Sequence, residues 1–467
     1  MSTGLSGAGL ARLREIFPPD RLLLDPSDRT AYGYDNSRRL ALPDAVALAV
    51  SAEEVRAAVV LCRELGLPLV ARGRGTNTTG ATVPVAGGLV LSLERMNRIL
   101  RLVPGDRLLE CEAGALNGEV QAAAEAQGLF WAPDPTSAAY STVGGNLGCN
   151  AGGPRAVKYG SARDNVLGLR AVAGTGAALQ TGSYTTKGAV GYDLTRLLVG
   201  SEGTLAVITQ AALKLLPKPE TTRTLRAAYR DVASAAAAVA RLMAQPETPS
   251  TLEFLDSESV RLAQAYRDCG LGPEVGALLL IEVDGSHTGI AGSVAAVSAA
   301  AAGAGLLELR ASANEAETGL LWAARKALSP ALRSLAPKKV NEDVAVPVSR
   351  LPELVAGLSE LSRRHALRIV SFGHAGNGNL HVNLLADPDD PAQMKAIEAC
   401  LGEVFRLVLK LEGTLSGEHG VGLEKRRFVA WEVPQPTLEA MAAVKRVFDP
   451  AGILNPGKAL PDLPSPT

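Results

Sequence analysis

Two of the five histidines in this chain lie on either side of a glycine-rich turn, in the stretch FGHAGNGNLHVNLL. They are His374 and His381, and the residues around them predict two antiparallel strands joined by the turn AGNG. If the pleat pairs His374 with Asn379, then Phe372 lies opposite His381 and the two imidazoles share one face as diagonal neighbours. Two rings placed in this way can share one metal ion. A hairpin whose histidines face solvent has the same spacing, because two histidines alone do not complete a metal site.

A carboxylate in a second glycine-flanked turn would supply a third ligand. The stretch SGEHGVG places Glu418 next to His419. His374, His381 and Glu418 then form a set of two histidines and one carboxylate, which suits Zn²⁺ or Mn²⁺ and leaves coordination positions open for a small molecule. This hypothesis requires the hairpin and the second turn to meet in the fold.

Glycine-rich loops elsewhere in the chain have the chemistry to hold a diphosphate. Residues 72–80, RGRGTNTTG, directly follow a predicted strand, and their N–H groups can turn inward as an anion-binding nest. The spacing matches neither the Rossmann nor the Walker pattern, and an ordinary wide turn has a similar composition. Residues 131–153 form a second polar loop, longer than the roughly 12–15 residues above which loops in compact domains are usually functional. A third polar turn, SEGT at 201–204, precedes a predicted strand.

The elements that must position these groups fall into two regions. From a capped helix at 51–66, strands alternate with helices up to about Leu216. The prolines at 214–222 are typical of a domain boundary. Beyond them, alanine-rich helices, a strand at 277–285 and a helix at 351–365 lead to the histidine hairpin, which indicates a separate α+β domain.

The overall composition favours a globular enzyme. A chain of 467 residues exceeds the length at which one hydrophobic core keeps growing, so more than one domain is expected. Lysine and arginine total 47 against 48 acidic residues without long blocks of either sign, which argues against nucleic-acid binding. The five cysteines are widely spaced, which argues against a disulfide framework, an iron–sulfur cluster or a cysteine zinc site. Without a basic leader or a long apolar segment, the sequence predicts a cytoplasmic protein with at most peripheral membrane association.

Six motifs follow one another in the order PLVARGRGTNTTGA, APDPTSAAYSTVGGNLGCNAGG, GYDLTRLLVGSEGTLAVIT, GHAGNGNLH, SGEHGVGLEK and FDPAGILNPGK. Together they resemble the FAD-linked D-2-hydroxyacid dehydrogenases. This family includes D-lactate dehydrogenases, D-2-hydroxyglutarate dehydrogenases and the FAD subunit of bacterial glycolate oxidase. The resemblance covers about residues 30–460, which is nearly the whole chain.

The resemblance implies an α+β fold. Its parts are a two-subdomain vanillyl-alcohol-oxidase (PCMH)-type FAD-binding domain, an α+β cap domain with an antiparallel sheet, and a C-terminal helical segment that returns to the FAD domain. The predicted boundaries are 1–40 for an N-terminal helical segment, 41–219 for the FAD-binding domain, 220–405 for the substrate or cap domain, and 406–467 for the C-terminal segment. This last segment is expected to complete the FAD and metal site.

The resemblance also implies where FAD binds. The diphosphate is expected against the first loop, at Arg72, Gly73, Arg74, Gly75, Thr76, Asn77 and Gly80. The second loop is expected to line the other side of the flavin with Pro133, Asp134, Thr136, Thr142, Gly144, Gly145, Asn146, Asn150 and Gly152. The adenine end is expected near Glu202, Gly203, Val207 and Ile208, and the isoalloxazine ring near Asn455. Some relatives attach FAD through a histidine of the flavin domain, but no histidine precedes His287 here, so non-covalent FAD is predicted.

The same resemblance assigns a reaction, which is the oxidation of a 2-hydroxy acid to the 2-oxo acid. The matching residues His374, His381 and Glu418 are expected to bind the metal, and His419 is expected to be the general base. Oxidation removes a proton from the hydroxyl oxygen and a hydride from the adjacent carbon, and the flavin accepts the hydride. A metal favours loss of the hydroxyl proton, and a histidine can accept that proton near neutral pH.

A substrate carboxylate calls for a cation with a bidentate fork. Arg325 matches the substrate-binding arginine of the family, and Ser329 lies one helical turn later. The alternative for Arg325 is a solvated arginine on a helix surface. Asn341 stands where D-2-hydroxyglutarate-type relatives carry a lysine, and Lys339 is displaced from that position. A small monocarboxylate such as glycolate or D-lactate is therefore the predicted substrate.

Other functions are compatible with parts of this pattern. One is a D-2-hydroxyglutarate dehydrogenase of the same family, and another is a non-redox flavin transferase on the same fold. A metal-binding module without catalysis would leave the flavin loops without a role. The chain has no cluster or haem motif, so electrons would leave through another subunit, a quinone, a soluble carrier or oxygen. The predicted partners are the substrate and either further subunits of a glycolate-oxidase-type complex or a second copy in a homodimer.

Overall fold

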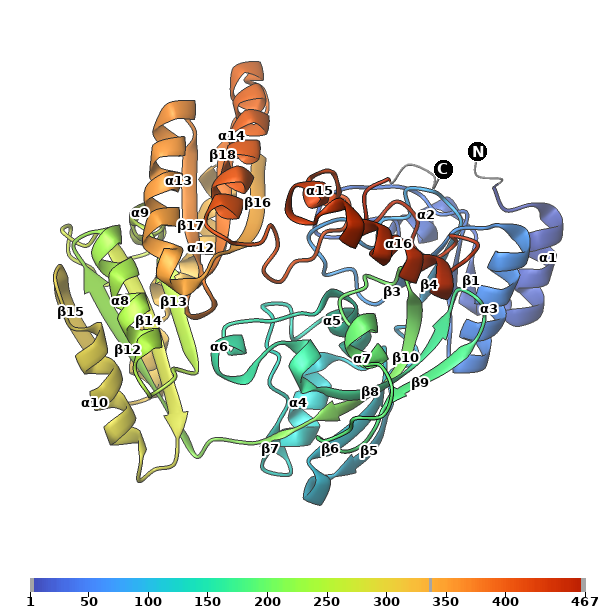
Figure 1. The fold of residues 1–467 in the computed structure, drawn as a ribbon, viewed down its shortest axis with the longest axis horizontal. Helices are drawn as coiled ribbons and strands as arrows, with labels where there is room; N and C mark the ends of the chain where they lie inside the picture. The colour runs from blue at the N-terminus through green and yellow to red at the C-terminus, as the bar shows by residue number, and fades with distance from the viewer. Residues whose placement is uncertain (1–3, 336–337, 463–467) are drawn as a thin grey trace. The chain divides into compact units, whose positions relative to one another are not determined.

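The computed structural model describes residues 4–335 and 338–462, apart from the side chains of residues 329–330, 333–335 and 338. The chain divides into two compact units (Figure 1). Unit 1 consists of Met1–Gly153, Gly160–Lys218 and Glu418–Thr467, and unit 2 consists of Pro154–Tyr159 and Pro219–Gly417. The tail of the chain therefore returns to unit 1 after it has completed unit 2.

The first sheet of unit 1 has the strand order β1-β2-β4-β3. Its strands are β1 (Leu22–Leu23), β2 (Ala45–Leu48), β4 (Leu89–Ser92) and β3 (Leu69–Arg72). Strands β2 and β3 both pair parallel with β4, so the chain needs a crossover between β2 and β3. Helix α3 (Ala52–Leu65) makes it, with the Ser51 hydroxyl accepting the Glu54 N–H at its start and Gly66 in the left-handed region at its end. Helix α1 (Gly7–Ile16) packs against α3.

The second sheet of unit 1 is antiparallel, with the order β5-β6-β10-β8-β9. Its strands are β5 (Ile99–Val103), β6 (Leu108–Glu112), β10 (Ala206–Lys214), β8 (Val166–Ala173) and β9 (Ala178–Gly182), and helices α4 (Asn117–Glu125), α5 (Val143–Cys149) and α7 (Leu194–Leu198) connect them. One hydrophobic cluster contains Leu69 and Leu91 from the first sheet and Leu109 and Leu213 from the second, so the sheets share a core. After the tail helices α15 (Val429–Glu432) and α16 (Gln435–Phe448), Leu454 forms a parallel bridge to Leu69.

Unit 2 contains a seven-stranded sheet in the order β15-β12-β14-β13-β17-β18-β16. The strands are β15 (Leu306–Ala311), β12 (Thr221–Tyr229), β14 (Ala277–Gly285), β13 (Thr251–Leu255), β17 (Arg368–His374), β18 (Asn379–Ala386) and β16 (Lys338–Ala345), and every pairing between neighbours is antiparallel. The helices of the unit include α8 (Val232–Ala244), α9 (Ser257–Tyr266), α10 (Ile290–Ala301), α12 (Ala323–Leu335), α13 (Leu351–His365) and α14 (Pro391–Lys410).

The register of this sheet places one continuous row of side chains on a single face. Directly opposed residues run from β12 to β16 in the order Ala228, Leu278, Leu255, Phe372, His381 and Asp343. The apolar part of the row belongs to a hydrophobic cluster with residues of α9 and α12. The polar part, His381 and Asp343, therefore lies on the same face as α9 and α12, because opposed residues in an antiparallel pair point to the same side.

The observed architecture confirms the predicted α+β fold class and the return of a C-terminal helical segment to the first unit. The strand at 277–285 and the helix at 351–365 have the predicted bounds. The sequence patterns did not identify β13 (Thr251–Leu255) or β16 (Lys338–Ala345). None of the described helices combines the length and the apolar character that a membrane span requires.

Asn117, at the start of α4, holds both ends of the second glycine-rich loop. Its Oδ1 accepts hydrogen bonds from Trp131 Nε1 at 2.9 Å and from Asn146 Nδ2 at 3.0 Å. Its Nδ2 donates to the Pro133 carbonyl at 3.3 Å. All of these groups are buried, so the amide of Asn117 satisfies polar atoms that water does not reach.

Replacing Asn117 with alanine should destabilise unit 1, because it leaves two buried N–H donors without their acceptor at a cost of about 1–3 kcal/mol each. Urea unfolding measures the loss, and amide hydrogen exchange across residues 131–153 should become faster. Gln180→Ala removes an exposed amide of the same unit and is expected to stay within about 0.5 kcal/mol of the unchanged protein. An Asn117→Ala protein with the stability of this control would contradict the role of the amide.

Candidate functional site

A cavity in unit 1 is lined by parts of all three polar loops and by the strands beside them. The residues predicted to contact the cofactor that line it are Arg72, Gly73, Thr142, Gly144, Gly145, Glu202, Gly203 and Ile208. These residues come from segments far apart in the sequence, and the shared core of the two sheets brings them together.

Glycines keep the walls of this cavity close together. A Cβ atom added to Gly73 would lie 2.3 Å from Thr142 Oγ1, which is the side chain that caps the N-terminus of α5. A Cβ atom added to Gly144 would lie 2.6 Å from the Cβ of Ala113. Since nonbonded carbon and oxygen atoms do not approach so closely, both positions require glycine, and the N–H of Gly144 donates to the carbonyl of Ala113 at 2.7 Å.

Polar groups around the cavity fit an anionic ligand. Arg72 is buried, and burial lowers the pKa of its guanidinium although Asp35 and nearby tyrosines act in the opposite direction. Its Nη1 donates to Thr82 Oγ1 at 3.1 Å. Among the described residues, the buried hydroxyls of Thr78 and Ser141, one in each glycine-rich loop, have no hydrogen-bond partner. These two residues do not line the cavity, but Arg72 does, and its Nε also lacks a hydrogen-bond partner among the described residues. Because buried polar groups are normally paired, Arg72 Nε is a candidate donor to an oxygen atom of a bound group. The residues present therefore fit the diphosphate of FAD.

The other residues predicted to bind FAD are not among those that line this cavity. Arg74 is exposed and pairs with Glu94, and Asn146 belongs to the network of Asn117. Asn150 adopts a positive φ and accepts hydrogen bonds from Ser161 and Arg163. Val207 is part of the hydrophobic core.

Asn455 is buried, and its Nδ2 donates to the carbonyls of Ala81 and Glu202. Gly75 and Gly80 both adopt positive φ in the first loop. The roles of Thr76, Asp134, Thr136 and Gly152 in cofactor binding stay predictions.

The turn that carries Glu418 and His419 is bound to the first two loops within unit 1. The carbonyl of His419 accepts a hydrogen bond from Asn77 Nδ2 at 3.0 Å. Glu418 Oε2 accepts the N–H of Gly153 at 2.8 Å. His419, the predicted base, and Glu418, the predicted carboxylate ligand, therefore lie in a turn that is hydrogen-bonded to the first and second glycine-rich loops.

The histidine hairpin of unit 2 has the predicted register. Phe372 pairs with His381 across β17 and β18, and the turn between the strands ends at Gly378 with a positive φ. The rings of His374 and His381 have their centroids 5.3 Å apart and meet edge to face. The two imidazoles are thus neighbours on one face, as the alternation of the strand predicts.

A buried carboxylate on β13 orients the first histidine. Glu253 opposes His374 in the register, and its Oε1 contacts His374 Nδ1. Its Oε2 accepts a hydrogen bond from Arg325 Nε at 2.7 Å, and the guanidinium of Arg325 lies over the ring of Phe372. Burial alone would raise the pKa of Glu253, but the charges of His374 and Arg325 outweigh it and lower the pKa well below its usual range. In metal sites such a carboxylate fixes the tautomer of the ligating histidine.

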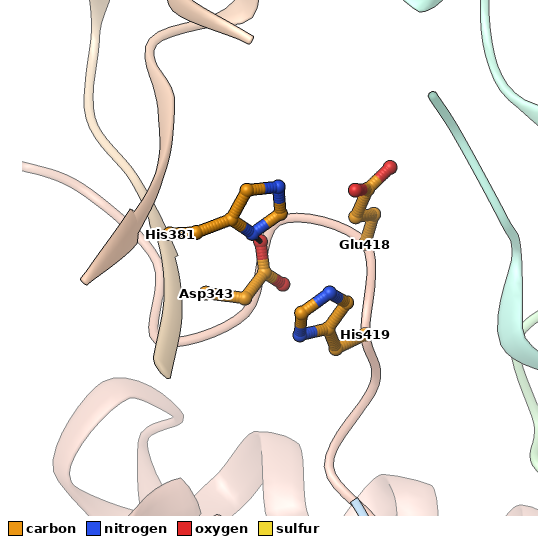
Figure 2. A group of neighbouring side chains, drawn as sticks. All are labelled: Asp343, His381, Glu418 and His419. Atoms are coloured by element: carbon orange, nitrogen blue, oxygen red, sulfur yellow. Dashed lines mark ion pairs between the residues drawn. The ribbon is translucent and has the colours of Figure 1, made fainter. Parts of the chain in front are cut away.

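Asp343, His381, Glu418 and His419 form a group in which one candidate ligand atom from each residue lies within 4.8 Å of the others (Figure 2). Asp343 is fully buried, with Oδ1 3.9 Å from His381 Nδ1, and its side chain accepts hydrogen bonds from Asn379 and Ser416. The N–H of Gly417 donates to the Asp343 carbonyl, and Glu418 is the next residue in the chain. His374 is outside this group of four and contacts it through the ring of His381.

The residues predicted to bind substrate lie on α12 and β16. Arg325 and Ser329 belong to α12, but the side chain of Ser329 is outside the described residues. Lys339 is exposed on β16, where it opposes Leu385, and Asn341 opposes Asn383 on β18. Asn383 is fully buried, and its Oδ1 has no hydrogen-bond partner in the part of the chain that is described.

Sequence reasoning missed Glu253 and Asp343, the two carboxylates that contact the histidines. Glu253 lies in a strand that is otherwise largely apolar, TLEFL at 251–255, whereas Asp343 lies in KKVNEDVA at 338–345, where most residues are polar or charged. A carboxylate in a largely apolar strand must find a charged or hydrogen-bonding partner when it is buried. That signal was available in the sequence for Glu253 but not for Asp343, and the partner of each carboxylate depends on pairing between distant strands.

Comparisons with known proteins agree with this geometry. Residues 43–182 match the family model described as FAD binding domain, and residues 218–459 match FAD linked oxidases, C-terminal domain. Glycolate oxidase subunit GlcD of Bacillus subtilis is 37% identical over 96% of this chain and 95% of its own length. The D-lactate dehydrogenase of Anaerostipes hadrus is 34% identical over 96% of both chains.

Solved structures share the fold at low sequence identity. p-Cresol methylhydroxylase superimposes with a TM-score of 0.81 at 16% identity over 99% of both chains. An alkyldihydroxyacetonephosphate synthase superimposes with a TM-score of 0.76 at 20% identity, covering 98% of this chain and 86% of its own. Taken together with the matched family models and the relatives that span nearly its whole length, these findings show that the chain belongs to the FAD-linked D-2-hydroxyacid dehydrogenase family and is an FAD-dependent oxidoreductase.

Proposed function

We propose that this protein oxidises a small 2-hydroxy acid, glycolate or D-lactate, to the 2-oxo acid, with a divalent metal ion and a histidine base. The observation that carries the proposal is the grouping of Asp343, His381, Glu418 and His419, with candidate ligand atoms within 4.8 Å of one another. Relatives that are named glycolate oxidase subunit and D-lactate dehydrogenase support the choice of substrate.

The cavity in unit 1 is the proposed FAD site. Arg72, Gly73, Thr142 and Gly144 would hold the diphosphate, since they combine a buried cation, a capping hydroxyl and glycines that leave no Cβ atom in the cavity wall. FAD supplies the hydride acceptor when it is bound. No histidine occurs before His287, so the cofactor is proposed to be non-covalent and extractable by denaturation.

His374, His381 and Glu418 are the proposed metal ligands, with Asp343 as a further oxygen donor beside His381. Glu253 supports the site because its carboxylate contacts Nδ1 of His374 and orients the imidazole ring. Two imidazoles and carboxylate oxygens suit Zn²⁺ or Mn²⁺, and such an ion polarises a hydroxyl group that it binds.

His419 is the proposed base, and a ring nitrogen of this residue takes the hydroxyl proton of the substrate. Asn77 binds the main-chain carbonyl of His419, and this hydrogen bond fixes the position of His419 beside the first glycine-rich loop. Arg325 is the proposed carboxylate anchor. Glu253 accepts a hydrogen bond from Nε of Arg325. The two Nη groups of Arg325 would then bind the carboxylate of the substrate.

The identity of the residue at 341 favours a monocarboxylate over D-2-hydroxyglutarate. Asn341 is neutral and opposes Asn383 in the sheet, and Lys339 is exposed on β16. A second carboxylate on the substrate would lack a cation at the position where one is expected. The relatives named as subunits support a further proposal, that other chains receive the electrons and that a lone chain turns over slowly.

Anaerobic addition of substrate should bleach the visible absorbance of the oxidised flavin. We expect glycolate or D-lactate to bleach the purified protein at micromolar to millimolar concentrations. L-Lactate and D-2-hydroxyglutarate should act much more weakly, the first because of its configuration and the second because of its second carboxylate. A flavin that none of these acids bleaches would rule out the proposed reaction.

Substituting His419 with alanine should preserve bound flavin and slow flavin reduction about 100-fold or more, because the hydroxyl proton loses its acceptor. Stopped-flow absorbance at saturating substrate measures the rate. His365→Ala, which removes a histidine that pairs with Glu403, is the matched control and should reduce its flavin at the normal rate. Equal rates in the two variants would exclude His419 as the base.

Arg325→Lys should raise KM about 10–100-fold while changing kcat less, because a point charge replaces a planar fork. Steady-state kinetics with an artificial electron acceptor separates the two constants. Arg364→Lys alters an arginine of the same unit that pairs with Glu403 and should leave KM unchanged. A normal KM in Arg325→Lys would show that the substrate carboxylate binds elsewhere.

A further inference from the structure

The carboxylate of Glu202 lines the flavin cavity and binds the main chain of the tail. Its Oε1 accepts the N–H of Val421 at 2.5 Å, and its Oε2 accepts the N–H of Gly422 at 2.8 Å. Glu202 itself adopts φ of 53°, an uncommon value for a residue with a side chain, and it is buried. A strained backbone and a carboxylate that is satisfied by two main-chain donors indicate a specific task at this position.

The glycines of the tail turn are explained by this contact. A Cβ atom on Gly420 would lie 2.4 Å from Glu202 Oε1, and Gly420 adopts φ of 84°. A Cβ atom on Gly422 would lie 2.3 Å from the carbonyl oxygen of Thr79, and Gly422 adopts φ of 50°. The sequence GVG after His419 therefore lets the main chain approach both the carboxylate and the first flavin loop.

The surroundings of Glu202 favour a stable contact. Burial raises the pKa of its carboxyl, whereas the N–H groups of Val421 and Gly422 and the charges of Lys458 and Lys425 act in the opposite direction. Lys458 Nζ donates to Asn455 Oδ1 at 3.0 Å. Asn455 Nδ2 in turn donates to the Glu202 carbonyl at 2.7 Å. The tail thus binds both the carboxylate and the main-chain carbonyl of Glu202.

We infer that Glu202 is a positioning residue, which fixes the main chain at Val421 and Gly422 and thereby sets the place of Glu418 and His419. The inference rests on the proposed function, in which those two residues are the metal ligand and the base. It differs from the role at the adenine end that the family resemblance implies for Glu202. Glutamine at this position would turn an amide donor toward one of two N–H donors, so at least one hydrogen bond would be lost.

The test compares Glu202→Gln with Glu112→Gln in the FAD-loaded protein. Glu112 is a buried carboxylate of the same unit that also accepts a main-chain N–H, from Arg98, but it lies on β6 away from the tail. Hydrogen exchange by mass spectrometry on peptides that contain Val421 and Gly422 reports the contact directly. Titration with Mn²⁺ alone reports the ligand set, and visible absorbance reports the flavin content.

Glu202→Gln should keep its flavin, exchange these amides about 10-fold faster and bind Mn²⁺ about 10-fold more weakly, as is usual when a supporting contact of a ligand is lost. Its rate of flavin reduction should fall without a matching rise in KM, whereas Glu112→Gln should behave as the unchanged protein. Normal exchange and Mn²⁺ affinity in Glu202→Gln would overturn the inference. Loss of flavin with normal exchange would also overturn it, since Glu202 would then be a cofactor contact.

Two arrangements keep the result decisive. If Glu202→Gln does not fold, Gly420→Ala disturbs the same contact from the tail, and unchanged exchange and Mn²⁺ affinity in that variant would refute the positioning role. If no hydroxy acid bleaches the unchanged protein, the proposed function fails. The exchange and Mn²⁺ measurements still decide whether Glu202 positions the turn, because neither depends on turnover.

Discussion

The structure of the candidate site depends on hydrogen bonds that hold the main chain of one short turn, residues 418–422. Asn77 and Glu202 bind its main chain, and the N–H of Gly153 binds the side chain of Glu418, so each of the three polar loops of unit 1 contributes one partner. The residues of the turn are partly buried and Gly422 is buried, and the side chains of Asn77 and Glu202 satisfy main-chain groups within it. The three loops that line the cavity of unit 1 therefore also hold the turn that carries the proposed base, His419.

In unit 2 the controlling constraint is the burial of charge. Glu253 is removed from water between His374 and Arg325, and each of the three would be costly without the others, since removal of one partner from a buried pair costs about 3–5 kcal/mol. The apolar residues of α9 and α12 exclude water from this face of the sheet. The same packing that stabilises the unit thus gives His374, a proposed metal ligand, a fixed tautomer and Arg325 a fixed direction.

Local features of this fold were predictable from the sequence, whereas pairings between distant segments were not. Caps and periodicity predicted the helix at 51–66, which is observed as α3 (Ala52–Leu65), and strict alternation gave the face shared by His374 and His381. Asp343 joins His381 only because β16 pairs with β18, and no local pattern encodes that register. The ordered motifs singled out the three polar loops that line the cavity of unit 1. The contact of Glu202 with the tail depends on the return of the chain after about 200 residues, which follows from tertiary packing alone.

The placement of Glu418 and His419 follows from how the chain is anchored on both sides of them. Before them, the N–H of Gly417 is bound to the carbonyl of Asp343, and after them the N–H groups of Val421 and Gly422 are bound to Glu202. Within unit 1, the hydrogen bonds of Asn77 and Glu202 to the main chain of residues 419, 421 and 422 restrict the backbone of this turn, which reduces the entropy that is lost when a ligand binds. Precise positioning of a base and a ligand is worth several kcal/mol to a reaction of this kind, and short anchored segments provide it without a rigid helix or strand. The glycines of SGEHGVG are then the residues that allow this segment to be so short, because only they accept the close approach of its anchors.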